Sequence, residues 1–330
     1  MRGVTICVGR PRIPNMTVLI LEPLEAEVVQ WLAERHDARF APELVGDYEG
    51  LLEALRDARA LVAPPEVCID ADLLRGASAL RAIGRASGGA ENIDLEACRK
   101  ARVEVVRSQT STASAEAEFA IGALLSLLRR VPVEGSDGLK VGRELGCSTI
   151  GLLGLTPAAR VLTQLLQAFG SRVIGYDTGL HPSDPIWARW GIEPVGLSEL
   201  VEHSDGLVLL MPYFERFRGL VGGRQLEGAG PGQVLVSLSH SGLLDELALA
   251  RALRGGQLLA AWFDSMEPGW LESGRPLSGI QTLQVTPRLA GTTRESRVRA
   301  AWAVARSIDA LLNAPPPDRK ASSKAALNPY

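Results

Sequence analysis

The sequence has few cysteines, no long apolar run and little net charge, and each of these absences excludes a class of protein. The cysteines lie far apart and form no Cys-x-x-Cys pair, which argues against a zinc site or a disulfide framework. We therefore expect reduced thiols, a cytoplasmic location and no bound metal. The four cysteines are Cys7, Cys68, Cys98 and Cys147.

Membranes and nucleic acids are excluded as partners by the same kind of argument. The longest apolar runs are broken by Arg, Glu or Gly, so none is long enough to span a bilayer. Residues 1–16 contain only a short apolar stretch before charge and proline interrupt it, unlike a signal peptide. A net charge of -3 leaves no cationic surface of the size that binds a phosphate backbone.

Hydrophobic residues, in contrast, make up 46% of the 330 residues, which is enough to bury the cores of two domains. Short β-branched apolar runs alternate with helix-period segments, and this alternation predicts parallel α/β sheets. Six consecutive runs in the second half predict a doubly wound nucleotide-binding domain. The runs begin at Thr17, Ala58, Leu80 and Val103 in the first half, and at Ser148, Ser171, Ser204, Gly232, Leu258 and Leu283 in the second.

Several segments resemble the D-isomer-specific 2-hydroxyacid dehydrogenases. Residues 80–106 are similar to that family's stretch around Gly-x-Gly-x-Asp-Asn-Ile-Asp, and residues 150–177 to its cofactor-binding βαβ unit. Residues 234–268 and 285–291 align without gaps to its Arg-Gly, Asp-Val-x-x-x-Glu-Pro and Thr-Pro-His segments. The resemblance extends over most of the chain.

The resemblance implies an α/β fold in which a doubly wound Rossmann-like domain is inserted into a flavodoxin-like α/β substrate domain. The Rossmann-like, NAD-binding-type domain is expected at residues 105–290. The substrate domain is expected to combine residues 17–104 with residues 291–313, because the last helix would return to the first domain. Residues 1–16 are expected to form an N-terminal extension and residues 314–330 a flexible tail. The resemblance also implies a homodimer, with the long apolar helix that begins at Ser114 and the loop after it near the interface.

The cofactor loop differs from the family at two positions. A dinucleotide fingerprint needs one glycine for a tight turn and a second where the backbone approaches the pyrophosphate. Gly154 supplies the first, but Thr156 puts a β-branched side chain at the second. Pro157 has no N–H to donate to a phosphate, whereas the next residue, Ala158, has one. Thr156 and Pro157 together are typical of an ordinary capped helix start, which is the interpretation we favour.

Asp177 ends the second strand of this domain, where the resemblance implies a carboxylate that binds the ribose of NAD. The alternative is a carboxylate that caps a turn or helix. NAD(H) is the cofactor implied by the family. We expect it to bind weakly or not at all, because both changes in the loop impair phosphate binding while improving helix capping.

The catalytic positions differ as well. In the family an Arg fixes the substrate carboxylate, a His exchanges the proton, and a Glu orients that His. The corresponding residues here are His240, Arg288 and Gly269, so that Arg and His have changed places and the carboxylate is missing. Asp264 is retained at a position that the resemblance assigns to the nicotinamide side. Glu116 occupies a position that is usually apolar.

The loop that binds the substrate carboxylate in the family contains Gly88 and Gly89 in this sequence, and its backbone N–H groups could bind an anion such as a small carboxylate.

Three functions remain open. The chain is a degenerate member that acts as a binding or interaction protein; or an NAD-dependent reductase of a small 2-keto acid; or a non-redox lyase or hydratase acting on a carboxylate through His240.

In the reductase hypothesis, Arg288 binds the anion and His240 does acid-base work from the opposite wall, oriented by Glu267 or Asp264. We favour the degenerate member, because hydride transfer also needs the cofactor site, and the sequence departs from the family in both places.

Overall fold

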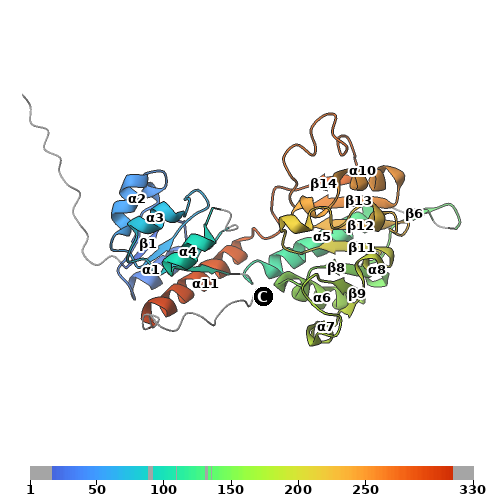
Figure 1. Cartoon of the computed structure of the whole chain (residues 1–330). Helices are drawn as coiled ribbons and strands as arrows, with labels where there is room; N and C mark the ends of the chain where they lie inside the picture. The colour runs from blue at the N-terminus through green and yellow to red at the C-terminus, as the bar shows by residue number, and fades with distance from the viewer. Residues whose placement is uncertain (1–16, 88–91, 109, 131–132, 135, 315–330) are drawn as a thin grey trace, which may run out of the picture. The chain divides into compact units, whose positions relative to one another are not determined.

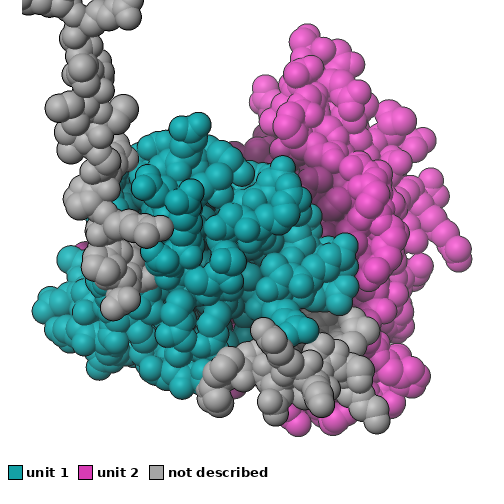
Figure 2. All heavy atoms as spheres, turned by 60° about the vertical axis from the view of Figure 1, so that its left-hand side comes forward, with its two compact units in different colours: residues 1–108, 297–330 teal, residues 109–296 magenta. Residues whose placement is uncertain are grey.

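The chain forms two compact α/β units, whose elements are labelled in Figure 1 and which are coloured separately in Figure 2. One unit combines the residues up to Ser108 with those from Arg297 on, and the other spans Gln109–Ser296. The computed structural model describes residues 17–87, 92–108, 110–130, 133–134 and 136–314.

The first unit is built on a five-stranded parallel sheet. Its strands are β1 (Val18–Ile20), β2 (Ala38–Phe40), β3 (Ala60–Val62), β4 (Ala82–Arg85) and β5 (Glu104–Arg107). They lie in the order β2-β1-β3-β4-β5, which confirms the flavodoxin-like prediction. The edge strand β2 is only half-buried and contains no apolar run, so the sequence did not predict it.

Helices cover this sheet. They are α1 (Ala26–Ala33), α2 (Tyr48–Leu55), α3 (Ala71–Gly76), α4 (Leu95–Ala101) and α11 (Arg294–Asn313), with a 3-10 turn, η1 (Pro42–Leu44). The last helix, α11, packs on the sheet of this unit. Its Val304 and Ile308 share one buried cluster with Val18 and Ile20 of β1. A Cβ on Gly84 of β4 would lie 2.5 Å from Val304, so the glycine allows the helix to pack closely.

The second unit contains a seven-stranded parallel sheet. Its strands are β8 (Thr149–Leu153), β9 (Arg172–Tyr176), β10 (Glu193–Pro194), β11 (Gly206–Leu209), β12 (Gln233–Ser237), β13 (Leu258–Phe263) and β14 (Leu283–Val285). The order β10-β9-β8-β11-β12-β13-β14 is doubly wound, because the chain leaves β8 in one direction and resumes on its other side at β11. The six predicted strands are all present, and the two-residue β10 is additional.

Two layers of helices bury the two faces of this sheet (Figure 1). The helices are α5 (Ala113–Arg130), α6 (Pro157–Phe169), α7 (Pro185–Trp190), α8 (Leu197–Glu202), α9 (Gly223–Leu226) and α10 (Glu246–Gly255). Shorter elements are the hairpin β6 (Val133–Glu134) and β7 (Lys140–Val141), and the turns η2 (Leu145–Cys147), η3 (Glu215–Phe217) and η4 (Ser241–Leu243).

Side chains along β11 point alternately to the two faces of the sheet, and each face has its own buried cluster. Val208 packs with α5 and α6 on one face, whereas Leu207 and Leu209 pack with α8 and α10 on the other. Eight apolar residues of these strands are at most 5% exposed, as expected for buried runs in a parallel sheet. They are Ile150, Leu152, Val173, Ile174, Val208, Leu209, Val234 and Val236.

The junctions between the units can be compared with those expected from the sequence. The boundary expected at residue 105 falls inside β5, and β5 pairs with β4 in the first unit, so the junction follows this strand.

Within the described part of the chain, no helix combines the length and apolarity needed to cross a membrane. The same residues contain no cluster of His, Cys, Asp or Glu able to hold a metal ion, and Cys68, Cys98 and Cys147 are free thiols. Cys7 lies outside the described residues.

Candidate active-site pocket

A pocket of about 260 Å³ lies at the carboxyl ends of β11, β12 and β13 in the second unit. Carboxyl ends of parallel strands meet at one edge of a sheet, and ligands of doubly wound folds bind there. Residues directly after the three strands form most of its lining, and α5 adds Glu116. The lining residues are Glu116, Leu210, Met211, Pro212, Tyr213, Leu238, Ser239, His240, Asp264, Ala290 and Gly291.

The loop after β8 keeps the tight turn of a dinucleotide-binding fold. Gly154 has a φ of +99°, a conformation that favours glycine. A Cβ at this position would also lie 2.5 Å from the backbone of Met211, the second residue after β11. The first glycine of the fingerprint is therefore required by the turn and by the close approach of the neighbouring chain.

The next residues form an ordinary capped helix start. Thr156 is the N-cap of α6, and its hydroxyl accepts a hydrogen bond from the N–H of Ala159 at 3.4 Å. Pro157 occupies the first helical position and has no N–H. Ala158, which is buried, supplies the remaining N–H among the first three helical residues. The geometry is that of the capped helix favoured from the sequence.

Asp177 fastens this loop to the end of β9. It is 8% exposed, and its Oδ2 accepts a hydrogen bond from the N–H of Leu155 at 2.8 Å. Its Oδ1 accepts another from the N–H of Gly179, also at 2.8 Å. Both carboxylate oxygens are thus used by backbone groups, which is the capping role that the sequence left open beside ribose binding.

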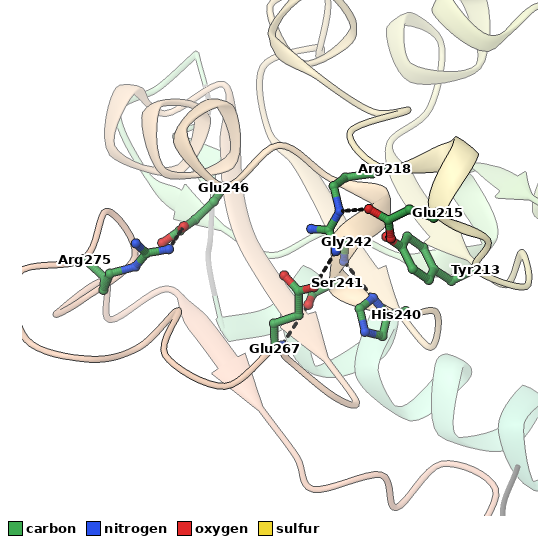
Figure 3. A network of polar contacts seen from close by, with 9 residues as sticks. All are labelled: Tyr213, Glu215, Arg218, His240, Ser241, Gly242, Glu246, Glu267 and Arg275. Atoms are coloured by element: carbon green, nitrogen blue, oxygen red, sulfur yellow. Dashed lines mark hydrogen bonds and ion pairs between the residues drawn. The ribbon is translucent and has the colours of Figure 1, made fainter. Parts of the chain in front are cut away.

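His240 follows β12 and is held by its own loop. Its Nδ1 accepts a hydrogen bond from the N–H of Gly242 at 3.1 Å, so the neutral ring carries its proton on Nε2 (Figure 3). The ring stacks on Tyr213 with 4.4 Å between ring centroids and an interplanar angle of 24°. Among the described residues, these contacts position His240, and neither Glu267 nor Asp264 bonds to it.

Glu267 belongs instead to an ion-pair network around Arg218. The Arg218 guanidinium donates to Glu215 at 2.8 Å and to Glu267 at 3.0 Å, and the Tyr213 hydroxyl donates to Glu215 at 2.6 Å (Figure 3). The hydrogen bond from Arg218, followed by that from Tyr213, holds the pKa of Glu215 below its usual value. Arg218 was not predicted from the sequence, because the contact that gives it a role joins residues 49 positions apart.

Asp264 lines the pocket, whereas Arg288 is joined to Asp264 through backbone atoms. Asp264, 7% exposed, accepts hydrogen bonds from the Thr286 hydroxyl at 2.9 Å, from the Leu289 N–H at 2.8 Å and from the Ala290 N–H at 2.9 Å. Arg288 has a φ of +56°, and its N–H donates to the Asp264 carbonyl. Its side chain is exposed and does not line the pocket. The structure therefore brings His240 and Asp264 together, without Arg288.

Glu116 extends from α5 into the same pocket. Its surroundings raise the pKa of this carboxyl: burial has the largest effect, the nearby charge of Asp264 acts in the same direction, and a hydrogen bond with Thr112 opposes both. The pocket thus contains two acidic side chains and one imidazole.

The remaining predicted positions lie elsewhere. Gly269 has a φ of +89°, and the nearest atom to a Cβ there would be the end of the Glu272 side chain, at 3.7 Å. A side chain at Gly269 would have space, but it would strain the backbone. Gly88 and Gly89, predicted to bind an anion, lie outside the described residues.

Comparison with known sequences gives consistent results. The family model described as D-isomer specific 2-hydroxyacid dehydrogenase, NAD binding domain, matches residues 128–290. The chain is 32% identical over 294 residues to the (S)-sulfolactate dehydrogenase of Chromohalobacter salexigens, covering 86% of this chain and 94% of that one. It is 31% identical over 301 residues to a D-3-phosphoglycerate dehydrogenase of Mycobacterium tuberculosis, covering 88% of this chain and 56% of the relative. It thus spans about half the length of the phosphoglycerate dehydrogenases that it matches.

Solved structures share the fold. The D-mandelate dehydrogenase of Rhodotorula graminis superimposes with a TM-score of 0.76 at 21% identity, covering 90% of this chain and 94% of that chain. An NAD+-bound 3-phosphoglycerate dehydrogenase of Entamoeba histolytica gives a TM-score of 0.68 at 20% identity, covering 90% and 95%. A protein of Thermus thermophilus gives 0.71 at 26% identity, covering 90% and 97%.

Proposed function

The chain belongs to the D-isomer specific 2-hydroxyacid dehydrogenase family, and from that premise we propose that it keeps the NAD-binding fold without performing the family's hydride transfer, and binds a small ligand instead. The start of α6 carries this proposal. The Thr156 hydroxyl already accepts a hydrogen bond from one of the first N–H groups of the helix. Pro157 has no N–H to donate. Dinucleotide-binding proteins hold a pyrophosphate with such groups, so these residues do not fit the cofactor.

Asp177 supports the same proposal. Its two carboxylate oxygens accept backbone hydrogen bonds from Leu155 and Gly179, so a residue expected to bind ribose instead holds the loop together. NAD(H) is the cofactor of the family, and we propose that this chain binds it weakly or not at all.

The substrate side of the pocket supports it as well. Reduction of a 2-keto acid needs a guanidinium that clamps the carboxylate and a His whose protonation is tuned by a carboxylate. His240 stands where the guanidinium is expected, and Gly269 where the carboxylate is expected. Arg288 is exposed outside the pocket lining, so the reductase with exchanged residues has less support than a binding role.

A non-redox enzyme is a second candidate, favoured by one observation. His240 and Glu116 line the same pocket and provide an imidazole Nε2–H and a carboxyl with a raised pKa. Such a pair can move protons without nicotinamide. Turnover of a carboxylate substrate without cofactor, lost in His240→Ala, would establish this candidate over the binding role.

Calorimetric titration with NADH and an assay of NADH oxidation test the proposal directly. We expect no binding in the low micromolar range, and no oxidation above background with glyoxylate, pyruvate or hydroxypyruvate from acid to neutral pH. Turnover that disappears in both His240→Ala and Arg288→Ala would overturn the proposal and establish the reductase with exchanged residues. Turnover that survives both substitutions would also overturn it.

We also propose that the chain forms a homodimer through α5 and the hairpin of β6 and β7. This hairpin projects from the second unit (Figure 1). Leu139 and Val141 are 61% and 46% exposed there, and Leu125 of α5 is 36% exposed. A second copy that covers these side chains would remove their apolar surface from water.

A further inference from the structure

A second cavity, of about 710 Å³, lies between α10 and the loop that follows β13 in the second unit. It shares no lining residue with the pocket at the strand ends. Three arginines line it, and among the described residues no carboxylate does so. We call it the arginine groove, after a lining that includes Leu247, Arg251 and Arg254 of α10 and Arg275, Pro276 and Ser278 of the loop.

The sequence of α10 places its part of the arginine groove on one face of the helix. Leu247, Arg251 and Arg254 are separated by four and three residues, so their side chains follow one stripe along the helix surface. Leu249 and Leu253, on the opposite side of the helix, pack in the core of the unit. The stripe is therefore the face that α10 leaves to solvent, and Leu247 is 58% exposed on it.

The three guanidinium groups meet one carboxylate. Arg275 pairs with Glu246, the first residue of α10 (Figure 3). Arg254 donates to the backbone carbonyl of Ser278 at 3.3 Å, a contact that holds the side chain but leaves its charge uncompensated. Arg251 is exposed and takes part in no ion pair or hydrogen bond within the described part of the chain. The groove thus has an excess of positive charge, in a chain whose net charge is -3.

Helix capping does not account for this charge. A cation in the last turn of a helix complements the helix dipole, and Arg254 occupies that turn. Arg251 precedes the last turn, however, and Arg275 is not part of the helix. Like charges gathered on one surface repel one another, and a bound anion would relieve that repulsion.

We propose that the arginine groove binds a small multivalent anion, whose phosphate or carboxylate groups are held by Arg251, Arg254 and Arg275. The planar guanidinium fork matches both kinds of oxyanion. Leu247 and Pro276 flank the arginines with apolar surface that a short hydrocarbon part of the ligand can contact. This second site goes beyond the binding role proposed for the strand-end pocket and does not depend on it.

Inorganic pyrophosphate and citrate are the probes, and acetate is the monovalent comparison. Their affinities for the full chain are measured by calorimetry at neutral pH and constant ionic strength, because salt screens exposed charges. We expect pyrophosphate, citrate or both to bind at least about tenfold more tightly than acetate, since several charge-assisted hydrogen bonds form together. Binding of pyrophosphate alone would assign phosphate groups to the ligand, and binding of citrate alone would assign carboxylates.

Arg251→Gln combined with Arg254→Gln should weaken this binding at least about tenfold. Arg275 is left in place, because its loss would deprive Glu246 of its cation. Arg251→Gln alone, which removes no printed contact of the chain, should weaken binding in the same direction and keeps the test valid if the double variant folds poorly.

Arg189→Gln combined with Arg224→Gln is the matched control. Both arginines are exposed in the second unit outside the groove lining, and their removal changes the net charge of the chain by the same amount. This pair should leave the affinities unchanged. Multivalent anions that bind no more tightly than acetate, binding that survives the loss of Arg251 and Arg254, or an equal loss in the control pair would each overturn the inference.

Discussion

At the residue scale, Asp264 illustrates how a family position can keep its side chain for structural reasons. Its carboxylate accepts three hydrogen bonds from the segment after β14, and two of the donors are backbone N–H groups. Sequence resemblance alone places this aspartate near a nicotinamide. The contacts show that it also fixes the chain that follows the last strand.

Asp264→Ala should therefore destabilise the protein, because it leaves donors unsatisfied in a buried site. We expect a loss of about 2–4 kcal/mol in the free energy of unfolding, measured by urea denaturation. Asp264→Asn keeps one acceptor oxygen and should lose less. Equal stability of the Ala variant and the unmodified protein would contradict this structural role.

Replacing Glu116 is expected to increase the stability of the protein, whereas replacing Asp264 is expected to decrease it. A carboxyl whose pKa is raised in the folded state binds its proton more tightly there than in the unfolded chain. Its favourable contribution is present below the ordinary glutamate pKa and is lost as pH rises through the raised value. Glu116→Gln should therefore increase stability at neutral and alkaline pH, with a difference that shrinks towards about pH 4. Urea unfolding across this range measures it, and a constant difference would contradict the assignment.

At the element scale, the start of α6 carries the proposal that the second unit binds NAD(H) weakly or not at all. The helix keeps a good N-cap at the cost of phosphate donors, since Thr156 bonds to Ala159 and Pro157 lacks an N–H. Replacing Thr156 by Gly should cost only a few tenths of a kcal/mol, because Gly is itself tolerated at N-caps. The capping contact can therefore be removed at a small cost in the stability of the helix.

The double substitution Thr156→Gly with Pro157→Arg should raise the affinity for NADH at least about tenfold. It restores an N–H and removes the side chain that crowds the diphosphate, and the guanidinium adds charge beside it. Calorimetry of the double variant against the unmodified protein measures the gain. Pro185→Arg, at the first position of α7 in the same unit, is a control that should leave NADH affinity unchanged. No gain in the double variant would show that other residues limit binding.

At the scale of the whole molecule, the sequence predicted the sheets well, because buried parallel strands are continuous apolar runs. The strands it missed in the two parallel sheets, β2 and β10, are short edge strands with the sequences ARF and EP. The site was less predictable. The stacking of His240 on Tyr213 and the pairing of Arg218 with Glu267 depend on how loops after different strands meet, and no local spacing encodes those contacts.

The proposed homodimer gives a prediction that involves the assembled molecule. If a second copy covers the hairpin of β6 and β7, a charged residue that replaces an apolar one there would be buried without a partner when the dimer forms. Leu139→Asp combined with Val141→Asp should therefore shift the protein to monomers, as seen by analytical ultracentrifugation. Leu271→Asp is the control, because Leu271 is 48% exposed in the loop after β13, away from the hairpin in sequence. A dimer that persists in the double variant, or that dissociates equally in the control, would place the interface elsewhere.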